Sequence, residues 1–121
     1  MPLIFIFYLG LYGVLEVYDV ESIQVLYENH AVEYSQHFRI RMKERNIKFA
    51  DIKIAIQSGE IIEQDLQDVP NPSVLILGYA RDNKPIHIVV GMDDAKLILI
   101  TAYFPMPTLW EADNKTRKVV E

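Results

Sequence analysis

The sequence of 121 residues contains no cysteine. Disulfide frameworks, thiolate zinc sites and cysteine nucleophiles are therefore excluded for this chain. The absence of disulfides is typical of cytoplasmic proteins, and we expect a cytoplasmic location. A positive net charge is also missing, because 12 Lys and Arg stand against 17 Asp and Glu, giving −5 at pH 7. This balance excludes a globally basic nucleic-acid-binding protein. The three histidines show no zinc-ligand spacing, so we expect neither a metal ion nor a cofactor.

The chain also has little that could cross a membrane as a helix. Residues 1–15 are strongly apolar, but a spanning helix needs about 20 such residues, and Glu16 and Asp19 follow closely. A signal peptide requires a Lys or Arg before its apolar run, and this run is preceded by none. Three interpretations stay open: an extra strand or helix packed on the core, a stretch upstream of the true start, or a membrane or export role. We treat residues 1–18 as an apolar N-terminal extension, residues 19–118 as a single domain and residues 119–121 as a tail.

Helical patterns fill the first half of this domain, and strand patterns fill the second half. The helical half begins at Asp19, which is an expected N-cap, and ends at Gly59, which is an expected helix terminator. Beyond Gly59, apolar runs alternate with turn signals, which indicates strands joined by tight turns. We expect helices over residues 19–30, 36–46 and 49–58, and strands over residues 60–65, 73–80, 85–92 and 96–104, with residues 31–35 as a short extended link. The predicted fold is α+β, with N-terminal helices packed on a three- to four-stranded antiparallel meander sheet.

The second predicted helix carries a stripe of basic and titratable residues. His37, Arg41 and Arg45 are spaced i, i+4 and i+8, so they share one helix face. Phe38 and Met42 lie on a neighbouring stripe with the spacing of core residues. A histidine followed by two arginines can hold a phosphate and move a proton beside it.

A second histidine, His87, lies in the middle of a predicted strand. A tight turn at residues 93–95 would place it across from Thr101 or Ala102 of the last strand. With Thr101 as the partner, His87, Thr101 and Tyr103 form a polar cluster on one sheet face. By simple alternation along the last strand, Leu97 and Leu99 would lie on the same face. The alternative is that His87 is a half-buried strand residue bonded to a neighbour.

Two histidines, paired arginines and a tyrosine fit metal-independent RNA cleavage. That reaction needs a base for the 2′-hydroxyl, an acid for the leaving 5′-oxygen and cations on the phosphate. Histidine can serve as acid or base near neutral pH, and arginine can hold two phosphate oxygens at once.

Several short motifs occur in a characteristic order along the domain. Together they resemble the bacterial domain-of-unknown-function family 4258, over roughly residues 19–118. The motifs are Ser35-x-His37-x3-Arg41-Met42-x2-Arg45-x-Ile47, Gly59-Glu60-Ile61-Ile62-Glu63, Asp68-x-Pro70-x-Pro72-Ser73-x-Leu75-x-Leu77-Gly78, Pro85-x-His87-x-Val89, Ile100-Thr101-x-Tyr103-x-Pro105 and Trp110.

In layout this family is similar to RelE-like toxins, the small α+β ribonucleases of bacterial toxin–antitoxin pairs. The resemblance implies His37, His87 and Tyr103 as catalytic residues, with Arg41, Arg45 and Thr101 binding the substrate. It also implies an antitoxin partner, often of a zinc-finger type, RNA or a ribosome as target, and no membrane. Two alternatives remain: a non-catalytic module that binds protein or nucleic acid through the arginine stripe, and a small-ligand domain that uses the same pocket.

Overall fold

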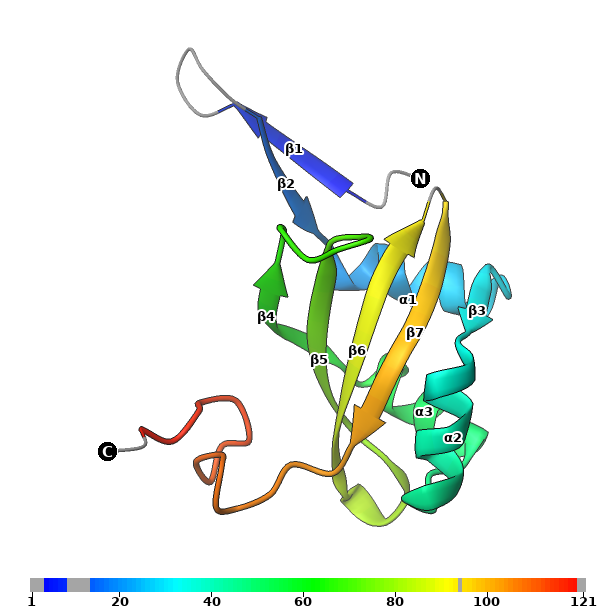
Figure 1. The fold of residues 1–121 in the computed structure, drawn as a ribbon, viewed down its shortest axis with the longest axis vertical. Coiled ribbons are helices and arrows are strands. Elements are labelled where there is room, and N and C mark those ends of the chain that lie inside the picture. Colours follow the sequence, from blue (N-terminus) through cyan, green and yellow to red (C-terminus); the bar gives the residue numbers. More distant parts are fainter. Residues whose placement is uncertain (1–3, 9–13, 94, 120–121) are drawn as a thin grey trace.

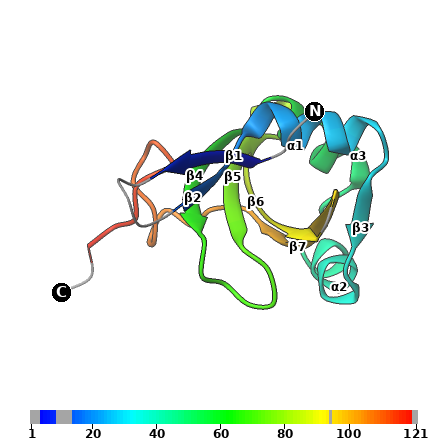
Figure 2. The same cartoon turned by 90° about the horizontal axis from the view of Figure 1, so that it is seen from above.

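The computed structural model describes residues 4–8, 14–93 and 95–119. It confirms an α+β fold, with a five-stranded sheet in the order β3-β7-β6-β5-β4. Figure 1 shows this sheet face-on, and Figure 2 shows α1 and α3 inside its arc, with the chain after β7 passing outside it. In chain order the elements are β1 (Ile4–Tyr8), β2 (Val14–Tyr18), α1 (Val20–Glu28), β3 (Val32–Tyr34), α2 (Gln36–Glu44), α3 (Phe49–Gln57), β4 (Glu60–Asp65), β5 (Ser73–Tyr79), the 3-10 turn η1 (Arg81–Asn83), β6 (Pro85–Asp93) and β7 (Lys96–Tyr103).

The helices lie where the sequence predicts them, because their ends carry local signals. The carboxylate of Asp19 accepts a hydrogen bond from the Glu21 amide at 3.0 Å and begins α1. The hydroxyl of Ser35 accepts one from the Phe38 amide, also at 3.0 Å, and begins α2. Such N-caps contribute about 1 kcal/mol each. After α2, Asn46 has a φ of 56°, the left-handed conformation that commonly follows a helix end.

The sheet has five strands, so the prediction of three to four strands is wrong. The missed strand is β3, which lies in residues 31–35, where only a short extended link was expected. Residues 32–34 are extended, as predicted, but they also pair in parallel with β7 as strand β3. The Leu97 amide donates to the Ala31 carbonyl at 2.9 Å, and the Ser35 amide donates to the Leu99 carbonyl at 3.3 Å. Residues 32–34 are too few to show a strand periodicity in the sequence, so this strand could not be predicted from its own residues. It forms because the edge of β7, some 65 residues later in the chain, is open for pairing.

A β-bulge in β7 changes which of its residues share a face. Val89 pairs with Thr101 and Val90 pairs with Leu99, so Ile100 is an extra residue without a partner in the ladder. The expectation that Leu97 and Leu99 share a face with Thr101 and Tyr103 is therefore wrong. Leu97 and Leu99 are buried in the core beneath the helices, while Thr101 points to the opposite face. His87 is opposite Tyr103, not Thr101 or Ala102 as expected.

The core lies between the helices and one face of the sheet. Phe38, Ile52 and Ile56 of the helices are fully buried there against Ile76 and Ile88 of the strands. The contact between α3 and β5 is close at Gly78, where a Cβ atom would lie only 2.0 Å from the Ala55 carbonyl oxygen. A residue without a side chain is therefore required at this crossing.

Strands β1 and β2 form a hairpin with a two-stranded sheet of its own. In Figure 1 this hairpin extends beyond the end of the five-stranded sheet. Of the three interpretations of residues 1–15, packing of an extra strand or helix on the core depends on side chains outside those that the structure describes. Among the helices in the described part of the chain, none has the length and apolar composition of a bilayer-spanning helix.

The close contact at Gly78 generates a stability prediction. We expect Gly78→Ala to lower the free energy of unfolding by about 1–3 kcal/mol, because the new methyl group meets backbone that must shift. Gly91→Ala is the matched control: its Cβ would lie 3.2 Å from Cδ1 of Ile100, an atom that can move. Urea unfolding of both variants checks this, and equal effects would contradict the proposed crossing.

Candidate functional site

The face of the sheet that the helices leave uncovered carries His87 and Tyr103 side by side. They are directly opposite each other on β6 and β7. Nδ1 of His87 lies 3.2 Å from the Tyr103 hydroxyl, and the two rings meet edge-to-face at 5.2 Å. Thr101 shares this face two residues earlier on β7, because it pairs with Val89. The polar cluster of His87, Thr101 and Tyr103 is therefore present, in a register different from the expected one.

The hydrogen bonds of His87 define its tautomer. Nε2 lies 2.7 Å from the backbone carbonyl of Asn114. A carbonyl oxygen only accepts hydrogen bonds, so Nε2 carries the proton, and Nδ1 accepts from the Tyr103 hydroxyl. Both ring nitrogens of the neutral imidazole are thus satisfied.

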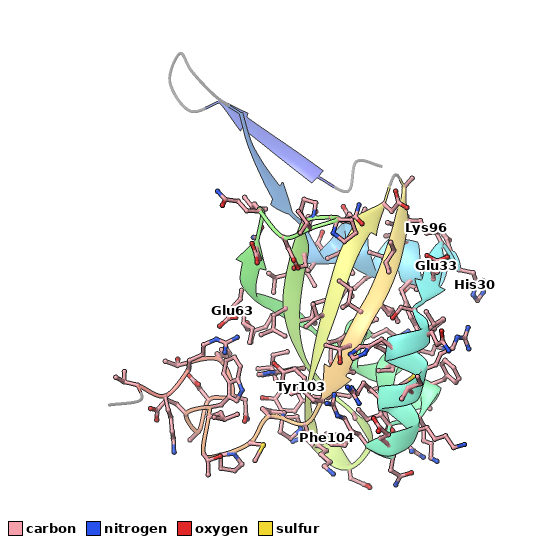
Figure 3. The ribbon with its side chains drawn as sticks, viewed as in Figure 1. His30, Glu33, Glu63, Lys96, Tyr103 and Phe104 are labelled. Atoms are coloured by element: carbon pink, nitrogen blue, oxygen red, sulfur yellow. The ribbon has the colours of Figure 1, made fainter. Side chains whose placement is uncertain are left out.

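The C-terminal segment, residues 105–118, covers His87. Trp110 is buried and its ring meets the imidazole edge-to-face at 4.4 Å. The segment is attached to β4 by ion pairs, since the Arg117 guanidinium binds both carboxylate oxygens of Glu63 at 2.8 and 2.9 Å. Figure 3 shows Tyr103 near the C-terminal end of β7, with Glu63 on the strand that this segment approaches. As a result His87 is 0% exposed.

Burial governs the ionisation of both residues. It lowers the pKa of His87 by disfavouring the charged imidazolium, against a smaller effect in the other direction from the Asn114 carbonyl. Burial also raises the pKa of Tyr103, because the phenolate would lose its hydration. Under this segment the pair is therefore a neutral histidine and a neutral tyrosine.

Arg45 reaches the same end of the sheet from the C-terminus of α2. Its Nη1 donates to the Ala102 carbonyl at 2.7 Å and to the Thr101 hydroxyl at 3.4 Å. Two of the predicted substrate-binding residues, Arg45 and Thr101, are thus in contact beside the His87–Tyr103 pair.

The other two members of the helical stripe lie farther from this cluster. Arg41 forms an ion pair with Glu44 on the surface of α2. His37 is exposed in the first turn of α2, about 12 Å along the helix axis from Arg45 at 1.5 Å per residue. Among the described residues, no hydrogen bond, ion pair or ring contact joins His37 to His87, Thr101 or Tyr103.

Sequence reasoning assigned no role to the residues that cover His87. Asn114 and Arg117 occur in a polar stretch that resembles ordinary surface, and Glu63 was noted only as part of a family motif. Their role follows only from the contacts of the C-terminal segment with β4 and β6. Trp110 was noted as part of the family resemblance, but its contact with His87 joins residues 23 positions apart.

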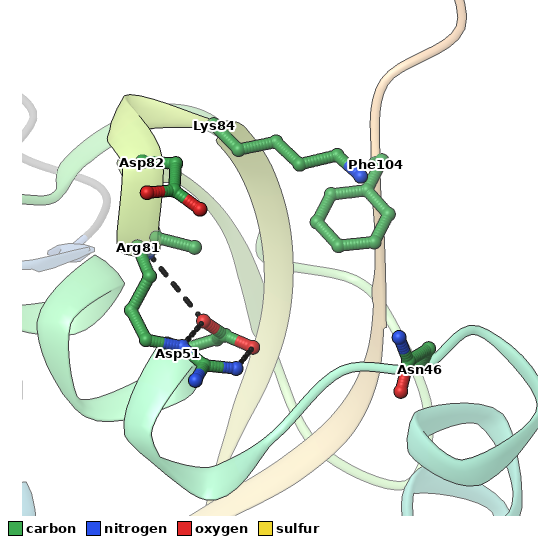
Figure 4. Close-up of a pocket in the computed structure, with 7 residues that line it drawn as sticks. Asn46, Asp51, Arg81, Asp82, Lys84 and Phe104 are labelled. Atoms are coloured by element: carbon green, nitrogen blue, oxygen red, sulfur yellow. Dashed lines mark hydrogen bonds and ion pairs between the residues drawn. The ribbon is translucent and has the colours of Figure 1, made fainter.

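A hollow of about 690 Å³ lies at the end of the sheet near η1. Figure 4 shows that one side of it is closed by the Asp51–Arg81 ion pair, which lowers the pKa of Asp51 to about 2. Opposite, the Lys84 ammonium lies 3.8 Å from the centre of the Phe104 ring. None of the predicted site residues lines this hollow. Within the described residues, no three His, Asp or Glu side chains are grouped as they would be around a metal ion.

The environment of His87 generates a prediction about its protonation. We expect ¹⁵N NMR to show the Nε2–H tautomer and a pKa below the ordinary 6.5. Because the pKa is lowered in the folded state, the stability that the neutral ring provides is lost as the pH falls below about 6.5. Trp110→Ala should shift this pKa back towards 6.5 by admitting water. A value at or above 6.5 in the unmodified protein would contradict the buried arrangement.

Comparison with known proteins identifies the domain. The sequence model of the family described as "Domain of unknown function (DUF4258)" matches residues 34–104, which is more than half of the chain. The match includes all six predicted site residues and ends before the C-terminal segment. No curated protein and no solved structure matches the chain. The match confirms the resemblance over residues 34–104, a shorter span than the expected residues 19–118, and the chain belongs to domain-of-unknown-function family 4258.

Proposed function

We propose that this chain is a metal-independent RNA endonuclease, the toxin of a bacterial toxin–antitoxin pair acting in the cytoplasm. The observation that carries the proposal is the His87–Tyr103 hydrogen bond at the end of the sheet that Arg45 reaches. A proton-transferring side chain, its orienting partner and a guanidinium thus lie at one end of the sheet, with His87 beneath the C-terminal segment. The resemblance of the family to RelE-like toxins supports the choice of RNA by analogy.

The reaction assigned to this patch is cleavage by the neighbouring 2′-hydroxyl. A base removes the 2′-proton, the 2′-oxygen attacks phosphorus, the bond to the 5′-oxygen breaks, and an acid protonates that oxygen. The products are a 2′,3′-cyclic phosphate and a 5′-hydroxyl. Arg45 and Thr101 would contact the phosphate, and Arg41 lies one helical turn before Arg45, towards the N-terminus of α2.

We assign the acid role to His87 in its imidazolium form, which can form once the C-terminal segment has moved away and the ring is hydrated, because a neutral imidazole is too weak an acid to donate its Nε2 proton. Its Nε2 carries the proton, while Nδ1 is held by Tyr103. Tyr103 would therefore act as a positioning residue for the imidazole. The base role falls to His37 in this proposal. Because base and acid act on oxygens of the same phosphate, the proposal requires His37 to come within reach of the phosphate that His87 serves.

Access to His87 requires the C-terminal segment to leave the sheet face. Asn114 occupies the nitrogen that would protonate the leaving oxygen. Moving the segment breaks exposed ion pairs, which contribute little, and exposes Trp110. The structure with the C-terminal segment over His87 is then the closed form in this proposal. An antitoxin, often of a zinc-finger type in such pairs, and a ribosome are the partners that the proposal implies.

The direct test is cleavage of a labelled RNA oligonucleotide in the presence of a chelator. We expect His87→Gln and His37→Ala each to slow cleavage by about 10²–10⁴-fold, the usual contribution of a general acid or base. Tyr103→Phe should slow it less, because the ring remains in place, and Arg45→Ala should weaken substrate binding. Mass spectrometry of the products checks for the cyclic phosphate.

Two controls accompany this test. A substrate with 2′-deoxyribose throughout should resist cleavage, and Lys96→Ala, at the far end of β7, should leave the rate unchanged. If only His37→Ala is without effect, the site reduces to His87, Tyr103 and Arg45. If neither the unmodified protein nor a Trp110→Ala variant, in which the cover of His87 is weakened, cleaves RNA, the alternative of a non-catalytic interaction module, with His87 as a structural residue, takes precedence.

A separate prediction concerns the covering segment. We expect Trp110→Ala to raise the cleavage rate, because the apparent activity scales with the fraction of molecules in the open form. Leu109→Ala is the matched control, since Leu109 is the preceding residue but is 53% exposed. An unchanged rate in Trp110→Ala, with the fold intact by circular dichroism, would show that the segment does not limit access.

A further inference from the structure

A second surface, away from His87, combines an apolar floor with a basic rim. A hollow of about 440 Å³ lies where α2 leads into α3. A second hollow, of about 500 Å³, shares Phe49 with it and continues past Tyr34 to Lys53. We call the two together the Phe49 groove. The first hollow is lined by Arg39, Met42, Lys43, Ile47, Lys48 and Phe49.

The floor of the groove is preformed. Met42 and Ile47 are buried at its base, and Phe49 stands above them with 50% of its surface exposed. The Phe49 ring meets Tyr34 edge-to-face at 5.1 Å, and the Arg39 guanidinium covers Tyr34 at 5.4 Å. These contacts hold the exposed ring in place, so little conformational entropy would be lost when a partner binds it.

The charges around the groove are uncompensated. In the described part of the chain, none of Arg39, Lys43, Lys48 or Lys53 takes part in an ion pair, whereas Lys115 and Arg117 of the C-terminal segment do. The first hollow has no acidic residue in its lining, and Glu28 is the acidic residue lining the second. Within the described residues, a positive rim on a chain with net charge −5 therefore lacks acidic partners for its ion pairs.

We propose that the Phe49 groove binds an amphipathic helix of another protein that carries acidic residues on both sides of an apolar stripe. The apolar stripe would cover Phe49 and Met42, and the acidic flanks would meet Lys43 and Lys48. Helices in grooves are recognised in this way, through apolar anchors one helical turn apart. The aliphatic floor favours such a helix over RNA, because it offers no hydrogen-bond partner to the edge of a base. None of the groove residues belongs to the site around His87, so either proposal can fail alone.

The test uses a fluorescein-labelled peptide of about four helical turns, with Leu at i, i+3, i+4 and i+7 positions and Glu between them. We expect saturable binding to the full chain by fluorescence anisotropy. The double variant Lys43→Glu, Lys48→Glu should weaken it by about tenfold or more, because like charges then face each other. Phe49→Ala should also weaken binding, as a second and charge-neutral variant.

Matched controls make the result specific. Lys84→Glu, Lys96→Glu changes the net charge equally at places outside the groove and should alter the affinity by less than about twofold, the effect of a distant rim charge. A peptide of the same composition with the Leu stripe scrambled should bind weakly. The proposal is overturned by any of four results: no saturable binding, equal effects of the two double variants, tighter binding of single-stranded RNA through the same lysines, or a self-associated protein that Phe49→Ala dissociates.

Discussion

The bulge at Ile100 is the constraint on which the rest of the structure depends. A strand alternates its side chains, so without an extra residue Leu97 and Leu99 would share a face with Thr101 and Tyr103. The bulge lets the first half of β7 bury its leucines under the helices, while the second half presents Thr101 and Tyr103 to the other face. One unpaired residue thereby serves both the core and the candidate site. Bulges are often found next to functional sites for this reason.

The second face of the sheet is closed by residues that lie beyond the family domain. The family match ends at residue 104, and the segment that buries His87 begins directly after it. Trp110 contributes apolar cover, the Asn114 carbonyl accepts a hydrogen bond from Nε2 of His87, and Arg117 joins the segment to β4. The domain and its cover are thus separable in sequence although they are joined in structure. This arrangement explains how a histidine in the middle of a sheet can be both fully buried and a candidate for chemistry.

The distribution of charge separates two surfaces of the chain. Two basic residues of the C-terminal segment are matched to acids on β4, in the pairs Arg117–Glu63 and Lys115–Glu60. Basic residues around Phe49 have no such partners among the described residues. Net charge alone describes neither surface, because a total of −5 contains both a compensated and an uncompensated region. In the first region, ion pairs join the C-terminal segment to β4. In the second region, around Phe49, the basic charges are left available for the acidic partner that we propose.

The sequence by itself determined what depends on neighbours along the chain. Asp19 and Ser35 cap helices locally, Asn46 adopts the left-handed conformation after α2, and alternation with turn residues predicts β5, β6 and β7. The family could also be recognised, because its motifs are short and ordered. Tertiary structure alone decided the pairing of β3 with β7, the bulge at Ile100, the partner of His87 and its cover by Trp110. Each of these joins segments far apart in the sequence, and its free energy comes from packing and hydrogen bonds that exist only once the sheet has formed.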